Sequence, residues 1–186
     1  MDTLRAFIAL ELPDRLRHEL SLHAERFSGL DKHYRMRWLP PENYHLTLAF
    51  LGNITPGTVS RLSVLLNSLQ QHPPVFLQFR ELSSFPFSKT PKVAAALLER
   101  SSELAALQEK VVRVCRSAGV VLERRRFEPH VTMGRMRRSR KPLNLPPISI
   151  LLSGKAEVVV LYESELTRHG AVYTPLSEVK LEDDEP

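Results

Sequence analysis

The chain has 186 residues, of which 42% are hydrophobic and 25% charged, and this predicts one compact domain or two small lobes rather than a disordered chain. Its net charge of +5 is only weak evidence for a polyanionic partner, because many basic proteins bind nothing anionic. The single cysteine, Cys115, excludes an internal disulfide framework and a cysteine-rich zinc site.

The first half of the chain predicts strands and helices in alternation. The apolar run LRAFIALEL (4–12) predicts a buried strand, and Asp14 is placed to cap a helix behind it. HLTLAFLG (45–52) predicts a second strand, and a second helix opens near Thr58. VFLQFRELSSF (75–85) follows with partial period-2 alternation, so we expect a further strand there.

The second half begins again in the same style. VAAALLE (93–99) predicts a strand, although its alanines also suit a helix, and Ser101 or Ser102 caps the helix that follows. HVTMGRM (130–136) predicts the next strand. After a proline-rich turn come three more predicted strands, ISILLSG (148–154), KAEVVVLYESEL (155–166) and AVYTPLSEVKL (171–181). The last two are separated by TRHG and predict a hairpin.

Both halves therefore run strand, helix, connection and a strand that begins with His-x-Thr. The units at about 4–52 and 93–137 form a degenerate internal repeat that occurs only twice. We predict an α+β fold in which residues 1–186 form a single domain of two pseudo-symmetric lobes. A cleft is expected between the lobes.

The spacing of the two His-x-Thr motifs places polar side chains in pairs. Residues i and i+2 of a strand share a face, so His45 and Thr47 are expected to face together. His130 and Thr132 are expected to do the same. The alternate apolar residues of the first strand, through Phe50, are predicted to face a core. If the lobes are related by a pseudo-dyad, the two pairs meet in one cleft.

These residue types suit acid–base work on a phosphodiester. Imidazole titrates near pH 6.5, so one histidine can accept a proton while the other donates one. Threonine hydroxyls can hold the non-bridging phosphate oxygens. A lone histidine on a strand is more often structural, but two copies at matching positions of a repeat favour function. The sequence contains no HExxH, no GxxxxGK[ST] and no GxGxxG, so we expect neither a metal nor a cofactor.

A basic stretch brackets the second motif. The residues between Arg124 and Lys141 include Glu128 as the only acidic side chain. A solvated loop explains any one of these cations as well as a site does, whereas the group beside a candidate site favours a phosphate-bearing substrate. Its basic members are Arg124, Arg125, Arg126, Arg135, Arg137, Arg138, Arg140 and Lys141.

The pair HLTLAFLG and PHVTMGR resembles the two signatures of the two-histidine phosphoesterase superfamily. RAFIALELP, RWLPPENYHLTLAFLG and LYESELTRHGAVYTPL resemble its microbial RNA 2′,3′-cyclic phosphodiesterase branch, long called 2′-5′ RNA ligase, so the resemblance covers nearly the whole chain. It implies a bilobal fold of two antiparallel-rich sheets with outer helices and a central cleft that carries both HxTx motifs. Met133 departs from the aliphatic residue usual in the family.

The resemblance also implies the reaction and the roles. An RNA-terminal 2′,3′-cyclic phosphate is hydrolysed to a 2′-phosphomonoester without a metal. His45 matches the proton donor and His130 the proton acceptor, while Thr47 and Thr132 match the phosphate-binding threonines. Arg135 is a candidate substrate contact, although its parity puts it on the opposite face unless Gly134 breaks the strand.

Two other functions stay open: a 2′-5′ RNA ligase, and a non-catalytic module that binds phosphorylated RNA ends. The expected partner is RNA with a 2′,3′-cyclic phosphate end, such as tRNA fragments, or small cyclic nucleotides. The sequence has no basic-then-apolar leader and no apolar run of about 18 residues, so we expect a soluble cytoplasmic protein, without a membrane partner and monomeric.

Overall fold

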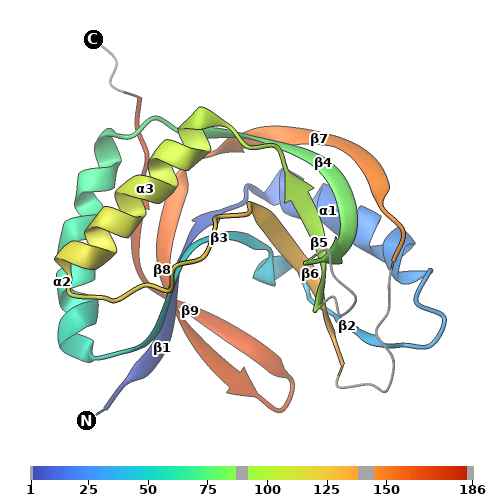
Figure 1. Cartoon of the computed structure of the whole chain (residues 1–186), viewed down its shortest axis with the longest axis horizontal. Coiled ribbons are helices and arrows are strands. Elements are labelled where there is room, and N and C mark those ends of the chain that lie inside the picture. The colour runs from blue at the N-terminus through green and yellow to red at the C-terminus, as the bar shows by residue number, and fades with distance from the viewer. Residues whose placement is uncertain (1, 87–91, 138–144, 184–186) are drawn as a thin grey trace.

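The computed structural model describes residues 2–86, 92–137 and 145–183, and Figure 1 shows the arrangement of their strands and helices. The strands are β1 (Leu4–Glu11), β2 (Met36–Trp38), β3 (His45–Ile54), β4 (Val75–Phe85), β5 (Val93–Leu98), β6 (His130–Met136), β7 (Ile148–Ala156), β8 (Val158–Thr167) and β9 (Gly170–Lys180). The helices are α1 (Asp14–Ser28), η1 (Pro41–Asn43), α2 (Pro56–Leu66), η2 (Asn67–Gln71) and α3 (Ser102–Ser117), η1 and η2 being short 3₁₀ turns.

All strands belong to one antiparallel sheet, in the order β7-β4-β5-β6-β3-β1-β8-β9, with β2 paired to β6. The two motif strands, β3 and β6, meet at its centre through the single pair Leu46 and Val131. The α+β class is confirmed, but the two expected sheets are joined into one at this point. Strand order is mirrored about the junction: β5 corresponds to β1, β4 to β8 and β7 to β9. The division into two pseudo-symmetric lobes stays a prediction of the internal repeat.

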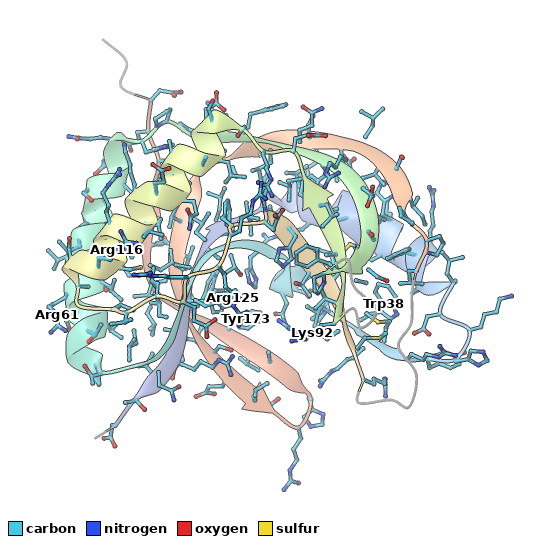
Figure 2. The ribbon with its side chains drawn as sticks, in the orientation of Figure 1. Trp38, Arg61, Lys92, Arg116, Arg125 and Tyr173 are labelled. Atoms are coloured by element: carbon cyan, nitrogen blue, oxygen red, sulfur yellow. The ribbon has the colours of Figure 1, made fainter. Side chains whose placement is uncertain are left out.

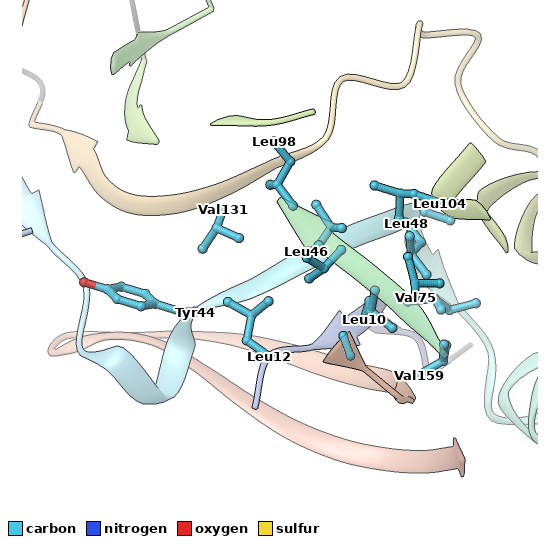
Figure 3. Close-up of a cluster of buried hydrophobic side chains, with 14 of the residues drawn as sticks. Leu10, Leu12, Tyr44, Leu46, Leu48, Val75, Leu98, Leu104, Val131 and Val159 are labelled. Atoms are coloured by element: carbon cyan, nitrogen blue, oxygen red, sulfur yellow. The ribbon is translucent and has the colours of Figure 1, made fainter. Parts of the chain in front are cut away.

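The core fills the face of the sheet that the helices cover. α1, α2 and α3 lie along the outside of the curved sheet (Figure 1). Figure 3 shows the apolar contact between the lobes, where Leu46 and Val131 pack among Leu10, Leu98 and other buried side chains. Both members of the central pair are fully buried. Truncating such a leucine to alanine costs about 2–5 kcal/mol of stability, so packing as well as hydrogen bonding joins the halves.

The starts of the helices explain one success and one error of the sequence reading. The Ser101 hydroxyl accepts a hydrogen bond from the Leu104 N–H at 3.1 Å, so the predicted cap of α3 is confirmed. Asp14 was predicted to cap α1, but Pro13 holds that position and offers no side-chain acceptor. Asp14 instead lies in the first turn, where its carboxylate faces the positive end of the helix dipole and pairs with Arg17.

The strands of the second half follow the expected pattern. β5 is a fully buried strand, which resolves the ambiguity of its alanines in favour of strand. The predicted C-terminal hairpin is confirmed, since β8 and β9 pair from Thr167 and Gly170 at its turn down to Val158 and Lys180. β2 was not predicted, because three residues are too few for a periodic signal.

Candidate active site

Both His-x-Thr motifs begin the two strands at the centre of the sheet. Because β3 and β6 are antiparallel and pair at Leu46 and Val131, the register sets His45 across from Thr132. By the same register Thr47 lies across from His130. The four polar side chains are half-buried and share one face of the sheet, opposite the helices, which we call the motif face.

The two imidazoles are held in the same way. His45 Nδ1 lies 2.9 Å from the Asn43 carbonyl oxygen, and His130 Nδ1 lies 2.7 Å from that of Glu128. A carbonyl oxygen only accepts, so each Nδ1 carries the proton and donates it. Each anchor is the residue two positions before its histidine. Nε2 of each ring is therefore the nitrogen left to accept a proton from a substrate or, once protonated, to return it.

Aromatic rings fix both imidazoles from the side. Phe7 of β1 stacks on His45, with ring centroids 4.8 Å apart, and Tyr173 of β9 meets the same imidazole edge-on at 5.2 Å. Phe85 of β4 lies 4.5 Å from the His130 ring. Tyr173 comes from the C-terminal hairpin (Figure 2), so this hairpin forms part of the wall beside His45. These contacts, from two sides at His45 and from Phe85 at His130, help each imidazole to keep the orientation that proton transfer requires.

Burial shifts the acid–base properties of both histidines in one direction. The pKa of His45 is lowered from 6.5 to about 4: desolvation is the main cause, the Arg135 and His130 charges act in the same direction, and the hydrogen bond to the Asn43 carbonyl opposes them. Desolvation, together with Arg135, also lowers the pKa of His130, while the Glu128 carbonyl and carboxylate oppose that shift. Both imidazoles are therefore neutral at pH 7 in the free protein.

Two β-bulges decide what else reaches the motif face. On β3, Ala9 pairs with Thr47 and Ile8 with Ala49, which leaves Leu48 as an extra residue. A bulge reverses the alternation of side chains beyond it. Phe50 is consequently turned to the motif face and is 66% exposed, so the prediction that it faces the core is wrong.

The second bulge does the same for β6. Ala95 pairs with Thr132 and Ala94 with Gly134, so Met133 is the extra residue and packs in the core. Arg135 then shares the face of His130 and Thr132, and its charge acts on both imidazoles. Strict alternation along the strand predicts Arg135 on the other face, unless the strand is broken near Gly134. The bulge between Thr132 and Gly134 is such a break, so Arg135 lies on the motif face.

Asn43 is a site residue that was not predicted from the sequence. Its carbonyl holds His45, and its side-chain amide donates a hydrogen bond to the Ala171 carbonyl at 3.1 Å, at the start of β9. Asn43 thus connects the hairpin that carries Tyr173 to the strand that carries His45. The sequence signal was weak, since Asn43 sits in a Pro-Pro-Glu-Asn stretch that reads as a turn.

The basic stretch is only partly described. Arg125 and Arg126 lie on the connection between α3 and β6 and pair with Glu123 and Glu128 at 2.8 and 3.7 Å. Arg137 Nε donates to the Met36 carbonyl. Exposed pairs of this kind contribute little to stability. Arg138, Arg140 and Lys141 lie outside the described residues.

The described part of the chain has neither a metal-binding cluster nor a membrane-spanning helix. It holds no group of three or more histidine, cysteine, aspartate or glutamate side chains arranged to bind a metal ion. None of its helices is long and apolar enough to span a membrane. Cys115 is buried in the core, where desolvation raises the pKa of its thiol to about 12, so it has the character of a packing residue.

Comparisons with known sequences indicate the family of this chain. The family model of LigT-like phosphoesterases matches residues 10–94. An RNA 2′,3′-cyclic phosphodiesterase from Aeropyrum pernix is 31% identical over 155 residues, which cover 78% of this chain and 86% of that protein. One from Aquifex aeolicus is 29% identical, and the match covers 97% of this chain and 99% of the relative.

Solved structures resemble the whole chain. A protein from Thermus thermophilus superposes with a TM-score of 0.84 at 26% identity, covering 98% of this chain and all of that one. Escherichia coli LigT complexed with 3′-AMP gives a TM-score of 0.77 at 25% identity, covering 97% of this chain and 99% of its own.

Proposed function

This chain belongs to the LigT-like phosphoesterase family, and we propose that it is an RNA 2′,3′-cyclic phosphodiesterase that hydrolyses a terminal cyclic phosphate to a 2′-phosphomonoester. The observation that carries the proposal is the pair of identically anchored imidazoles. Each donates Nδ1–H to a carbonyl two residues upstream and keeps Nε2 for the substrate, on one face with Arg135.

The proposed reaction is an in-line displacement at phosphorus. His130 Nε2 takes a proton from water as the water oxygen bonds to phosphorus. The bond from phosphorus to the 3′ oxygen breaks on the opposite side, and His45 gives that oxygen a proton from its own Nε2. The phosphate stays on the 2′ oxygen. Both protons move between nitrogen and oxygen, so the step requires no metal, nucleotide or other cofactor.

Charge at the phosphorus is held by the remaining motif residues. The Thr47 and Thr132 hydroxyls are proposed to donate to non-bridging phosphate oxygens, and the Arg135 guanidinium to neutralise them. Substrate binding also changes the protonation state of the site. A bound phosphate anion raises the pKa of a nearby imidazole, which offsets burial and allows His45 to hold the proton that it donates.

The test is turnover of a short RNA ending in a 2′,3′-cyclic phosphate, with EDTA present. Wild type is expected to release the 2′-phosphomonoester, and His45→Ala and His130→Ala each to lose about 10²- to 10⁴-fold in rate. His23→Ala, at a histidine of helix α1 on the face of the sheet opposite the motifs, is the matched control and should keep full activity. Activity that survives in either motif variant contradicts the proposal, and EDTA sensitivity would point to a metal.

A 2′-5′ ligase and a non-catalytic module for RNA ends are the other functions. The module predicts binding without turnover in the same assay. RNA with a cyclic phosphate end, including tRNA fragments, and small cyclic nucleotides are the proposed substrates. Work in the cytoplasm, as a monomer, remains a prediction of the sequence alone.

A further inference from the structure

Arg37 of β2 takes no part in the steps above, yet it lies on the motif face beside the site. Its neighbours in the strand, Met36 and Trp38, pack in or against the core, so the Arg37 side chain points to the opposite face. β2 pairs with the end of β6, where Arg37 lies directly across from Arg135. Arg37 is also exposed. The motif face therefore carries two guanidinium groups on neighbouring strands.

The two guanidinium groups lie side by side without a carboxylate to neutralise them. No ion pair in the described part of the chain includes Arg37 or Arg135. Like charges directly opposite each other destabilise a sheet, and an anion bound on this face would relieve the repulsion. The proposed function uses Arg135 for the reacting phosphate. Arg37 is then a second cation for another negative group of the substrate.

The register of the strands places Arg37 next to His45. β2 continues the line of β3 along β6, so that both strands face the same partner. His45 lies across from Thr132, and the next pair on the motif face is Arg37 across from Arg135. Arg37 is therefore the neighbour of His45 on the side away from Thr47.

The C-terminal hairpin shows where the Arg37 guanidinium lies. A Cβ atom placed on Gly170, at the turn of this hairpin, would lie 2.5 Å from Arg37 Nη2. The guanidinium thus lies against the backbone of the turn. Tyr173 of the same hairpin contacts the His45 imidazole. Arg37 and the hairpin together extend the wall of the site on the His45 side.

The chemistry of the substrate identifies the anion that can reach Arg37. In the proposed reaction the 3′ oxygen departs beside His45, so the terminal ribose lies on that side of the phosphorus. A ribose carries its base at C1′ and its 5′ carbon at C4′, on opposite sides of the ring. The exposed ring of Phe50 lies on the motif face beyond Thr47, in the opposite direction from Arg37. With the base toward Phe50, the phosphodiester on the 5′ carbon lies toward Arg37.

We infer that Arg37 binds the phosphodiester that joins the terminal nucleotide to the rest of the RNA, so that the site prefers an RNA chain to an isolated cyclic nucleotide. The inference rests on the proposed function and adds a residue that recognises the substrate. A guanidinium can donate two parallel hydrogen bonds to a phosphate. This phosphate does not react, so its contact is the same in the ground state and the transition state. Losing the contact should therefore raise KM and leave kcat unchanged.

The experiment compares two dinucleotides that differ by one charge. Both end in a ribonucleoside 2′,3′-cyclic phosphate and begin with a deoxynucleoside, which keeps the internal linkage stable. That linkage is a normal phosphodiester in one and an uncharged methylphosphonate in the other. Wild type is expected to hydrolyse the charged dinucleotide with a kcat/KM about tenfold higher, through a lower KM.

Substitutions of Arg37 then test whether this preference belongs to its guanidinium. Arg37→Gln should lose the preference and hydrolyse the methylphosphonate dinucleotide as wild type does. Arg37→Lys should keep part of the preference, because it keeps the charge but not the paired hydrogen bonds. Arg116→Gln is the matched control and should keep the full preference, since Arg116 is an exposed arginine on the outer helix α3 (Figure 2).

The outcomes distinguish this inference from the function on which it rests. Equal kcat/KM of wild type on the two dinucleotides overturns the role of Arg37 and leaves the proposed function standing. An equal loss on both dinucleotides in Arg37→Gln also overturns that role, because it would place Arg37 at the reacting phosphate or in the fold. Failure of wild type to hydrolyse either dinucleotide instead contradicts the proposed function itself.

Discussion

The halves of the site around His45 and His130 are alike where they hold an imidazole and different where they face a substrate. In both, Nδ1 donates to a carbonyl two residues upstream, an aromatic ring packs beside the imidazole, and a β-bulge follows at the fourth residue of the motif strand. The halves differ at the fifth residue after the histidine, which is Phe50 in the first half and Arg135 in the second.

The surroundings of the two imidazoles differ as well. The His45 side is crowded by the rings of Phe7, Tyr162 and Tyr173. The His130 side instead borders a cavity of about 450 Å³, whose wall includes Arg80 and Arg100. Proton transfer needs the same geometry at both ends of a displacement, which explains the shared part. The reaction itself is not symmetric, since one oxygen arrives and another departs. The unlike parts are therefore where its direction must be set.

The largest effect should come from breaking the proposed polarity with a modified leaving group. In a cyclic phosphate with sulfur in place of the 3′ oxygen, the departing thiolate needs no proton. His45→Ala, slowed about 10²- to 10⁴-fold on the oxygen substrate, should recover most of that loss on the sulfur substrate. His130→Ala should stay slow on both, because water still needs a base. The measurement is the ratio of single-turnover rates on the two substrates for each variant.

The opposite pattern, with recovery only in His130→Ala, would exchange the two roles and reverse the direction of the site. Tyr34→Ala, at an exposed residue before β2, is a suitable control and should follow wild type on both substrates.

The next largest effect is expected at Arg135, the cation that occupies the position of Phe50 in the other half. Arg135→Gln is expected to lower kcat/KM about 10²-fold, since the phosphate charge loses its partner. Arg135→Lys should restore part of it. Arg137→Gln, two residues on, removes the same charge near the end of β6 and is the matched control, with a loss of less than about threefold.

The same variant has a distinct signature in the pH profile. One imidazole must be protonated and the other neutral, and the pKa of each lies below 6.5, so kcat/KM should rise as pH falls from 7 until the second imidazole is protonated. Arg135 lowers both pKa values, so its removal raises both. The maximum of kcat/KM should therefore move to higher pH in Arg135→Gln. If kcat/KM falls but its maximum stays at the same pH, Arg135 does not influence the pKa values of the two imidazoles.

The features that the two halves share could be predicted from the sequence, because they depend on the local pattern of residues. The recurrence of His-x-Thr at matching points of the repeat, the apolar residue between, and the cap at Ser101 are all set by nearby residues. These features predict the central strands, the helix behind the second one and the shared face of each His–Thr pair. The family resemblance rests on the same short segments.

The difference between the halves was not readable, because it depends on register. A bulge exists only relative to a partner strand, and nothing in HLTLAF or HVTMGR marks Leu48 or Met133 as the extra residue. Alternation carried past these points sent Phe50 into the core and left Arg135 uncertain. The Asn43 link to Ala171 was hidden for a similar reason, since it joins residues far apart in the sequence.

The smallest effect should come from Phe50, the counterpart of Arg135. Phe50 is 66% exposed on the motif face and pairs in register with Phe7, whose ring stacks on His45. An exposed ring there is placed to stack on a base of the RNA. Phe50→Ala should raise KM about fivefold to tenfold for a short RNA, because one base stack contributes about 1–3 kcal/mol, and leave kcat nearly unchanged.

Phe50→Trp should keep KM low. Phe76→Ala serves as control, since Phe76 is a 59% exposed phenylalanine on β4, away from the motifs. If kcat rather than KM falls in Phe50→Ala, the ring supports the His45 imidazole through Phe7, and the two halves would differ in how they hold their histidines as well as in what they offer the substrate.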